Sequence, residues 1–330
     1  MRVVAAVDKF KGTATGAQVA AAVGSACWEL GHDCVELPVA DGGEGTLEAL
    51  GGANRTSTVT GPLGDPVDAQ WRLHRGTAVI EMARASGLTL VGGAASNDAM
   101  AASTIGTGEL IDMALDAGAK KIIVCLGGSA TTDGGYGAIR AILAPHRLRG
   151  VQVLVACDVR TRFLDAADVF GPQKGASPAQ VKLLTGRLHR LAQIYEHDYG
   201  VDVREIDGTG AAGGIAGALV ALGGRLLPGF DLVADELDLH DAIAAADVVV
   251  TGEGYLDEQS FEGKVVGGVA GLAHTLAVPV VAIAGRIYDG TEDRIEAVSL
   301  VERFGEERAL EDTLRCVEEA TADVLASRGA

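Results

Sequence analysis

Short runs of apolar residues alternate with longer stretches of helical periodicity along most of the chain. The apolar runs are rich in Val and Ile, which is typical of strands buried on both faces of a parallel sheet. They lie at residues 3–7, 34–39, 121–126, 151–156, 247–250 and 278–284. Helical patterns lie at 15–29, 106–117, 178–195 and 263–275, and an amphipathic pattern covers 308–330. This order predicts an α/β fold with right-handed crossovers.

Residues 54–90 break this alternation. Strand-like stretches at 56–60, 67–73 and 77–82 follow one another without a long helix, and the first two flank the turn sequence G-P-L-G-D-P. The pattern predicts antiparallel hairpins in a second domain inserted into the first, and a chain of 330 residues is long enough for two domains. We expect one parallel-sheet domain formed by 1–50 and 240–330, and a smaller mixed α/β domain formed by 51–239.

Composition and charge exclude several classes of protein. The chain has 46 glycines, but no Gly-X-Y period and 48% apolar residues, so neither collagen nor a disordered chain fits. A net charge of −18 argues against nucleic-acid and anionic-membrane partners. The five cysteines are scattered, without a C-x-x-C pair, so we expect reduced thiols and a cytoplasmic protein. The first residues do not resemble a signal peptide, and no apolar run approaches the roughly 20 residues of a membrane span.

The glycines concentrate in four segments, most of which follow a predicted strand. These are ADGGEGT at 40–46, GGSATTDGG at 127–135, GTGAAGG at 208–214 and TGEGYLD at 251–257. Ligands of open α/β sheets bind beyond the carboxyl ends of the strands, where the backbone N–H groups of glycine-rich turns can approach phosphate oxygens. One such segment is equally well explained by a tight turn, but four together favour a site. None contains the Walker or dinucleotide fingerprint.

Acidic and basic side chains accompany these segments. Phosphoryl transfer requires a phosphate cradle, a divalent ion held by carboxylates, a cation and a base. The acids at or just past predicted strand ends are Asp8, Asp41, Glu44, Asp133, Asp158, Glu253 and Asp257, and the nearby lysines are Lys9, Lys11, Lys174 and Lys264. One or two of the acids would suffice for Mg²⁺. The histidines lack metal-site spacing and no G-x-S-x-G motif occurs, which disfavours zinc and serine-hydrolase chemistry.

Nine motifs, in the same order, resemble the bacterial glycerate kinase family (type 1). They are DKFKG at 8–12, VADGGEGT at 39–46, TGPLG at 60–64, IEMA with ASGL at 80–88, TIGTGE at 104–109, GGSATTDGG at 127–135, VFGPQKGA at 169–176, GAAGG at 210–214, and TGEG at 251–254 with Asp257, Gln259, Gly263 and Lys264. The resemblance implies phosphorylation of D-glycerate to phosphoglycerate with ATP and Mg²⁺. It also implies a Rossmann-like domain with a smaller mixed α/β domain inserted into it, and a site in the cleft between them.

The resemblance also suggests the site residues. The catalytic acids are expected among Asp41, Asp133 and Asp158, and the motifs do not decide which is the base. Substrate or phosphate groups are expected at Lys11, Gly42, Gly43, Ser129, Thr131, Lys174 and Lys264. The nucleotide is expected at Gly127, Gly128, Gly134, Gly252 and Glu253. The metal is expected at Asp133 and Asp257.

Four features depart from the family pattern. The family commonly has Ser in place of Lys9, Asn in place of Thr132 and Arg in place of Tyr255, and its link corresponding to residues 140–150 is longer. A phenol does not replace the bidentate fork of an arginine. Three functions therefore stay open: a glycerate kinase, a kinase for another small hydroxy acid or polyol, and a non-catalytic ligand-binding or regulatory protein. The choice between 2- and 3-phosphoglycerate and the oligomeric state, with a homodimer as one possibility, also stay open.

Overall fold

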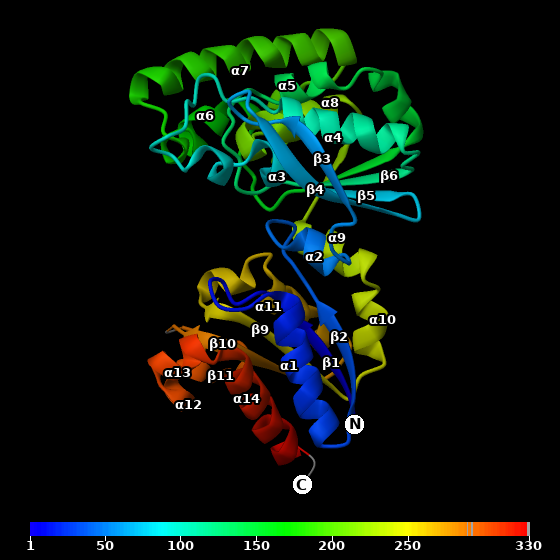
Figure 1. The fold of residues 1–330 in the computed structure, drawn as a ribbon, viewed down its shortest axis with the longest axis vertical. Coiled ribbons are helices and arrows are strands. Elements are labelled where there is room, and N and C mark those ends of the chain that lie inside the picture. The colour runs from blue at the N-terminus through cyan, green and yellow to red at the C-terminus, as the bar shows by residue number, and fades with distance from the viewer. Residues whose placement is uncertain (289, 292, 329–330) are drawn as a thin grey trace. The chain divides into compact units, whose positions relative to one another are not determined.

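The computed structural model describes residues 1–288, 290–291 and 293–328, which form two compact α/β units (Figure 1). The terminal unit comprises Met1–Asp41, Glu48–Leu50 and Phe230–Ala330, and the inserted unit comprises Gly42–Leu47 and Gly51–Gly229. The inserted unit is the longer of the two, contrary to the expectation of a smaller inserted domain. The domain boundaries after residues 50 and 239 stay a prediction.

The sheet of the terminal unit is entirely parallel. Its strands are β1 (Arg2–Val7), β2 (Asp33–Pro38), β9 (Val248–Leu256), β10 (Val280–Ile287) and β11 (Glu296–Ser299), in the order β11-β10-β9-β1-β2. This confirms the Rossmann-like sheet. The chain moves from β1 outward to β2 and later returns to β9 on the other side of β1, so the strand order reverses between β1 and β9.

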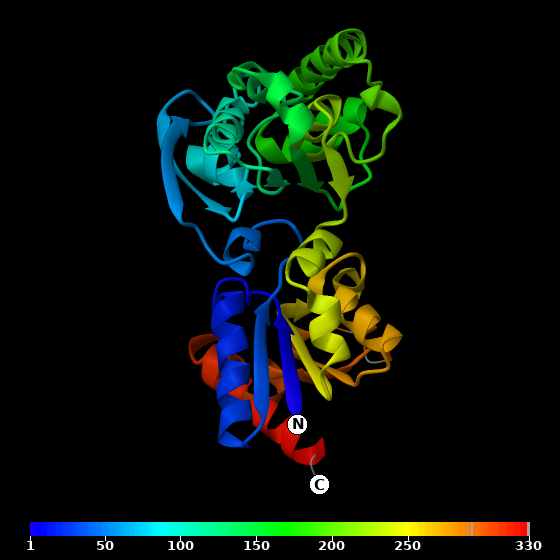
Figure 2. The same cartoon turned by 90° about the vertical axis from the view of Figure 1, so that its right-hand side faces the viewer.

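Helices cover both faces of this sheet, as the strands' apolar runs predict. They are α1 (Gly16–Glu29), α9 (Gly229–Glu236), α10 (Leu239–Ala244), α11 (Val265–Thr275), α12 (Leu300–Phe304), α13 (Glu306–Glu311) and α14 (Thr313–Arg328). Val3 and Val7 point toward α1 and α14 and pack with Val23 and Val317. Ala282 lies in the core on the other face, with Val266 of α11. Figure 2 shows α1 and α14, in blue and red, on one side of the strands, and α10 and α11 on the other.

The inserted unit has a mixed sheet. Its strands are β3 (Arg55–Thr60), β4 (Pro66–His74), β5 (Thr77–Glu81), β6 (Lys121–Cys125), β7 (Gln152–Ala156) and β8 (Arg225–Leu227), in sequence order across the sheet. The pairs β3–β4 and β4–β5 are antiparallel, which confirms the hairpins predicted for residues 54–90. The pairs from β5 to β8 are parallel, so these four strands end at one edge of the sheet.

Two helical layers lie above one face of this sheet. The helices are α3 (Ala83–Ser86), α4 (Ile105–Asp116), α5 (Tyr136–Ala141), α6 (Ala166–Phe170), α7 (Pro178–Tyr199) and α8 (Ile215–Ala221), while α2 (Thr46–Ala49) lies where the chain passes between units. Leu110 of α4 and Leu219 of α8 share a core with the strands. The long α7 packs through Leu184 and Leu188 on α6 and α8, and a Ser177 capping box fixes its first turn.

The structure corrects one expectation about the glycine segments. Strand β9 does not end at residue 250 but runs to Leu256, because Tyr255 and Leu256 still pair with Arg286 and Ile287 of β10. Most of the T-G-E-G-Y-L-D segment is therefore strand rather than loop. Across the residues that the structure describes, no helix combines the length and apolarity needed to cross a bilayer.

Candidate active site

A pocket of about 420 Å³ marks the edge where the parallel strands of the inserted unit end. Residues that follow β6 and β7 line it, among them Gly127, Gly128, Ser129 and Asp158. Lys174 lines it from the 3-10 turn Pro172–Lys174, which precedes α7. Open α/β sheets bind ligands beyond the carboxyl ends of their strands. Five residues that the sequence predicted for the site therefore lie together in the expected place.

Lys174 is a buried cation at this pocket, with 3% of its surface exposed. Its Nζ atom donates hydrogen bonds to Ser129 Oγ at 2.7 Å and to the carbonyl oxygen of Thr131 at 2.6 Å. Burial lowers the pKa of Lys174 to about 7, and the negative charge of Asp133 partly opposes that shift. Both hydrogen-bonding partners are uncharged. An ammonium group has three donors, so Lys174 can bind an anionic group that enters the pocket.

The loop that carries Ser129 and Thr131 is held by main-chain hydrogen bonds. Gly128 adopts a positive φ of 62°, which favours glycine, and its carbonyl oxygen accepts from Leu88 N at 2.8 Å. Asn97 Nδ2 joins this loop to the lysine turn by donating to the carbonyl oxygens of Ala130 at 3.0 Å and Lys174 at 2.8 Å. Sequence reasoning missed Asn97, because no motif contains it and only its contacts across the fold reveal it.

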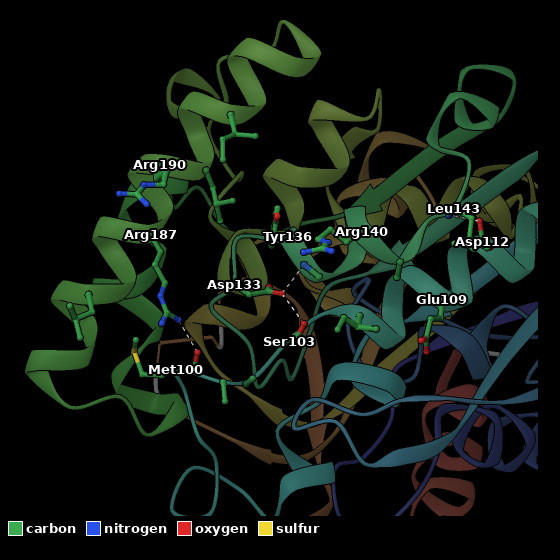
Figure 3. A pocket seen from close by; sticks show the side chains of 18 of the residues that line it. Met100, Ser103, Glu109, Asp112, Asp133, Tyr136, Arg140, Leu143, Arg187 and Arg190 are labelled. Atoms are coloured by element: carbon green, nitrogen blue, oxygen red, sulfur yellow. Dashed lines mark hydrogen bonds between the residues drawn. The ribbon is translucent and has the colours of Figure 1, made fainter.

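Asp133 is extensively hydrogen-bonded inside the inserted unit (Figure 3). Its Oδ2 atom accepts from Thr104 N at 2.9 Å, Thr104 Oγ1 at 2.8 Å and Gly137 N at 3.1 Å, with Ser103 Oγ at 3.4 Å. Its Oδ1 atom accepts from Gly135 N at 3.1 Å. These contacts fix the start of α5 and α4 against each other. Donors occupy both oxygens, an arrangement that suits a positioning residue better than a metal ligand.

Glu81, at the end of β5, organises the first glycine segment. Its Oε1 atom accepts from Gly45 N and Leu47 N, each at 2.9 Å. Within the same segment, Thr46 Oγ1 donates to the carbonyl oxygen of Gly43 at 2.8 Å. Glu81 was not among the predicted site residues, although the motif I-E-M-A contains it. The structure gives it the role of shaping the loop that follows Asp41 in the chain.

Asp158 and Gly42 both contact Gly229. A carboxylate oxygen of Asp158 accepts from Gly229 N at 2.7 Å. A Cβ atom on Gly42 would lie 2.5 Å from Gly229 Cα, so only glycine fits there. Asp158 is an exposed residue that lines the pocket, and its hydrogen bond to Gly229 N orients its carboxylate.

Two glycines predicted to contact the nucleotide have packing reasons of their own. A Cβ atom on Gly134 would lie 2.6 Å from a side-chain atom of Leu191, and one on Gly252 would lie 2.2 Å from the carbonyl oxygen of Ile283. Neither lines the 420 Å³ pocket. Close packing against α7 therefore explains why residue 134 is a glycine, and close packing against β10 explains the glycine at 252. Gly127 and Gly128, by contrast, line the pocket.

A second group of acids lies in the terminal unit, at the point where its strand order reverses. Asp8 follows β1 and Glu253 belongs to β9, the neighbouring strand. Burial raises the pKa of Asp8 to about 6, and the nearby charge of Asp41 adds to this shift. Burial also raises the pKa of Glu253 to about 7; a hydrogen bond with the Ser260 side chain and the charge of Lys264 oppose this shift, and the charges of Asp8 and Asp257 increase it. Crowded carboxylates of this kind favour a bound cation.

Two polar atoms of β9 are buried without a hydrogen-bond partner among the described residues: Glu253 Oε1 and Thr251 Oγ1. Asp257 is partly engaged, because its Oδ1 atom accepts from Ser260 N at 3.1 Å and caps a short 3-10 helix. The described part of the chain contains no cluster of three or more potential metal ligands. Any divalent ion here would therefore use one or two carboxylates, as Mg²⁺ commonly does beside a phosphate.

The remaining predicted lysines also belong to the terminal unit. Lys264 is the N-cap residue of α11 and lies near Glu253. Lys11 lines a small hollow of about 60 Å³ together with Tyr255 and Arg286. The predicted residues thus form two groups, one in each unit, and the two predicted metal ligands are divided between them: Asp133 lies in the inserted unit and Asp257 in the terminal unit.

Comparisons with known proteins identify the family of the chain. The model of the glycerate kinase family matches residues 3–145 and 143–328. The glycerate 2-kinase of Escherichia coli K12 is 40% identical over 329 residues, covering 88% of this chain and 86% of that protein. The glycerate kinase of Halalkalibacterium halodurans is 39% identical over 352 residues, covering 92% and 91%. Because that alignment is longer than the 330 residues of this chain, the relative has residues that this chain lacks.

A solved structure agrees over the full length of both chains. It is the crystal structure of a protein assigned as glycerate kinase 2 from Salmonella typhimurium LT2, with a TM-score of 0.85 and 35% sequence identity. The family match spans nearly all of the chain. The chain therefore belongs to the glycerate kinase family.

Proposed function

We propose that this chain is a glycerate kinase that transfers the γ-phosphoryl group of ATP to a hydroxyl group of D-glycerate. Within the family, the observation that carries the proposal is the pocket of the inserted unit, where buried Lys174 meets Ser129 and the glycine loop 127–131. A desolvated ammonium beside a glycine-rich loop suits a phosphate or carboxylate and offers little to a neutral ligand.

The reaction needs one proton transfer and one displacement. The hydroxyl oxygen of glycerate attacks the γ-phosphorus, the bond from that phosphorus to the β,γ-bridging oxygen breaks, and ADP leaves. The hydroxyl proton passes to a carboxylate. Lys174, with Ser129 and Thr131, would stabilise the negative charge of the anionic groups, and Gly127 and Gly128 would allow their close approach.

Three acids were expected as the base, and their surroundings differ. Asp133 is hydrogen-bonded on both oxygens, which favours a role in orienting the loop and supporting the charge of Lys174. Asp158 lines the pocket, and its Oδ1 atom accepts a hydrogen bond from Gly229 N. Asp41 follows β2 in the terminal unit and lies near Asp8. We propose Asp158 as the acid that acts on substrate in the pocket of the inserted unit, and Asp133 as a positioning residue, while Asp41 stays a predicted catalytic acid.

Mg²⁺ is part of the proposal, and the acids of the terminal unit fit it. The partnerless Glu253 Oε1 atom and the raised pKa values of Asp8 and Glu253 indicate negative charge that the described residues leave incompletely compensated. Two carboxylates, Glu253 with either Asp8 or Asp257, would hold the ion. When bound, Mg²⁺ would neutralise phosphate charge and orient the donor.

Several finer features extend the proposal. One relative is named a glycerate 2-kinase, which favours 2-phosphoglycerate as the product. We further propose a cytoplasmic enzyme that binds no nucleic acid, in keeping with the net charge of −18. A homodimer stays a prediction.

An ADP-release assay with D-glycerate and a panel of small hydroxy acids and polyols tests the function. We expect D-glycerate to give the highest kcat/KM. Turnover of another hydroxy acid in its place would support the alternative kinase, and ligand binding without any turnover would support a non-catalytic protein. Coupling the product to enolase distinguishes 2-phosphoglycerate, which is consumed directly, from 3-phosphoglycerate.

A further inference from the structure

The inserted unit contains a second pocket, larger than the one at the strand ends. It has a volume of about 1240 Å³ and lies between α7 on one side and α4 and α5 on the other (Figure 3). Its walls include the apolar side chains of Ile105, Met113, Leu191 and Ile194. Pockets for small molecules are commonly about 300–1,000 Å³ and mainly apolar. This hollow is therefore large enough for a ligand with an extended apolar body.

Two exposed leucines line the pocket. Leu143, on its rim, is 85% exposed, and Leu183 on α7 is 60% exposed. The two segments that match the family model overlap at residues 143–145, in the link between α5 and β7. Large apolar side chains that are exposed side by side commonly mark a ligand-binding or interaction site.

Three arginines line this apolar pocket: Arg140 from α5, and Arg187 and Arg190 from α7 (Figure 3). Arg187 Nη1 donates to the carbonyl oxygen of Met100 at 2.8 Å, and Arg140 lies over the Tyr136 ring, 5.7 Å from its centroid. The ion pairs of the described residues include none of the three. Unpaired arginines are notable in a chain with a net charge of −18.

The pocket's own acids are engaged elsewhere. Glu109 accepts hydrogen bonds from the N and Oγ1 atoms of Thr60 at 2.7 and 2.8 Å. Asp112 Oδ1 accepts from Leu143 N at 3.1 Å, and Asp133 is bonded as described above. Figure 3 shows Glu109 and Asp112 on the side of the pocket away from Arg187 and Arg190. The arginines on α7 therefore have donors available to an anion.

We propose that this pocket binds an amphiphilic anion: a carboxylate head group on an unbranched alkyl chain. The apolar walls would bury the chain, and the arginines would bind the carboxylate by charge-assisted hydrogen bonds. A second copy of this chain is a poorer occupant. In a two-fold symmetric contact the same patch faces itself, so each copy would bring its own three arginines against those of the other.

The probe is octanoate, with 1-octanol as an uncharged partner of equal chain length, titrated calorimetrically into the full-length protein. We expect octanoate to bind about tenfold more tightly than 1-octanol. The double variant Arg140→Gln/Arg187→Gln should lose about tenfold in octanoate affinity, the effect of removing charged hydrogen bonds, and change little toward 1-octanol.

A pair of glycine substitutions tests the location. Gly186 lies on α7 at the pocket, and a Cβ atom there would have no neighbour within 4 Å. Gly186→Trp should therefore fill the pocket and abolish octanoate binding without disturbing the fold. Gly271 of α11, in the terminal unit, is also exposed and likewise has no neighbour within 4 Å of its Cβ position. Gly271→Trp is the matched control and should bind octanoate like the unaltered chain.

Several results would overturn the proposal. These are no octanoate binding by the unaltered chain, equal binding of octanoate and 1-octanol, or unchanged octanoate binding by Gly186→Trp. Sedimentation velocity tests whether a second copy of this chain occupies the pocket instead. A dimer of the unaltered chain that Gly186→Trp dissociates would identify that second copy as the partner. None of these results depends on kinase activity, so they leave the proposed function untouched.

Discussion

Lys174 has a charge that depends on pH within the physiological range, because burial lowers its pKa to about 7. Below pH 7 the ligand-free pocket carries an ammonium group, and above pH 7 the amine is neutral. We expect the KM of the anionic substrate that Lys174 contacts, ATP or D-glycerate, to rise between pH 7 and pH 8.5. Steady-state kinetics across that range measure it. Lys174→Gln should remove the pH dependence, whereas the exposed Lys182→Gln on α7 should retain it.

Asp133 also affects the pH dependence of KM, because its negative charge raises the pKa of Lys174. In Asp133→Asn we therefore expect the pKa of Lys174 to fall further, and the rise in KM to begin at a lower pH. A loss in kcat of about 10²-fold at every pH, with an unshifted profile, would instead assign Asp133 to general base catalysis or metal binding.

The raised pKa of Glu253 determines how this residue changes the free energy of unfolding as pH rises. The folded-state pKa of about 7 exceeds the ordinary value of 4.5, so the folded chain holds this proton more tightly than the unfolded chain. The protonated carboxyl of Glu253 therefore contributes its full stability below pH 4.5, and that contribution is lost as pH rises through 7. Without divalent ions, Glu253→Gln should raise the melting temperature more at pH 8 than at pH 5.5. The exposed Glu262→Gln is the control and should show no such difference. Added Mg²⁺ should stabilise the unaltered chain more than Glu253→Gln.

At the scale of elements, the regular strands and helices were predictable from sequence. The apolar run at 121–126 became β6, and the helical pattern at 178–195 became α7, because burial and periodicity are local signals. The length of β9 was not predictable, since residues 251–256 carry glycines typical of a loop and are strand only through pairing with β10. The short β8 and β11 gave no clear pattern for the same reason.

The candidate site was predictable only where a motif contains the functional atoms. Lys174 and Ser129 were expected, and they are hydrogen-bonded. The packing roles of Gly134 and Gly252 were not, because a sequence does not show what a Cβ atom would touch. Asn97 was missed because its partners are distant in the sequence, with Lys174 77 positions away.

The turn before α8 packs against the glycine loop 127–131, and Gly213 lies against Thr131 of that loop. A Cβ atom on Gly213 would lie 1.9 Å from the carbonyl oxygen of Thr131, and its φ is +73°. Gly223 also has a positive φ, +93°, but a Cβ atom there would meet nothing. Gly223→Ala should cost about 1–2 kcal/mol of unfolding free energy, and Gly213→Ala more than about 3 kcal/mol. Urea denaturation measures both, and equal losses would show that the loop yields without cost.

For the whole molecule, family membership and the charge distribution account for different properties. The two α/β units and their ordered motifs assign the chain to the glycerate kinases. The net charge of −18 is a property of the entire surface, yet Lys174 and the arginines of the larger pocket provide local sites for small anions. A strongly acidic chain can therefore bind phosphate and carboxylate groups while repelling polyanions.

The central claim is that the chain phosphorylates D-glycerate using the pocket around Lys174. The most direct measurement is D-glycerate-dependent release of ADP from ATP by the unaltered chain, by Lys174→Gln and by Lys182→Gln under identical conditions. We predict activity in the unaltered chain and in Lys182→Gln, and a loss of kcat/KM of about 10²-fold or more in Lys174→Gln. Release of ADP that does not depend on D-glycerate, or equal rates in all three proteins, would contradict the account.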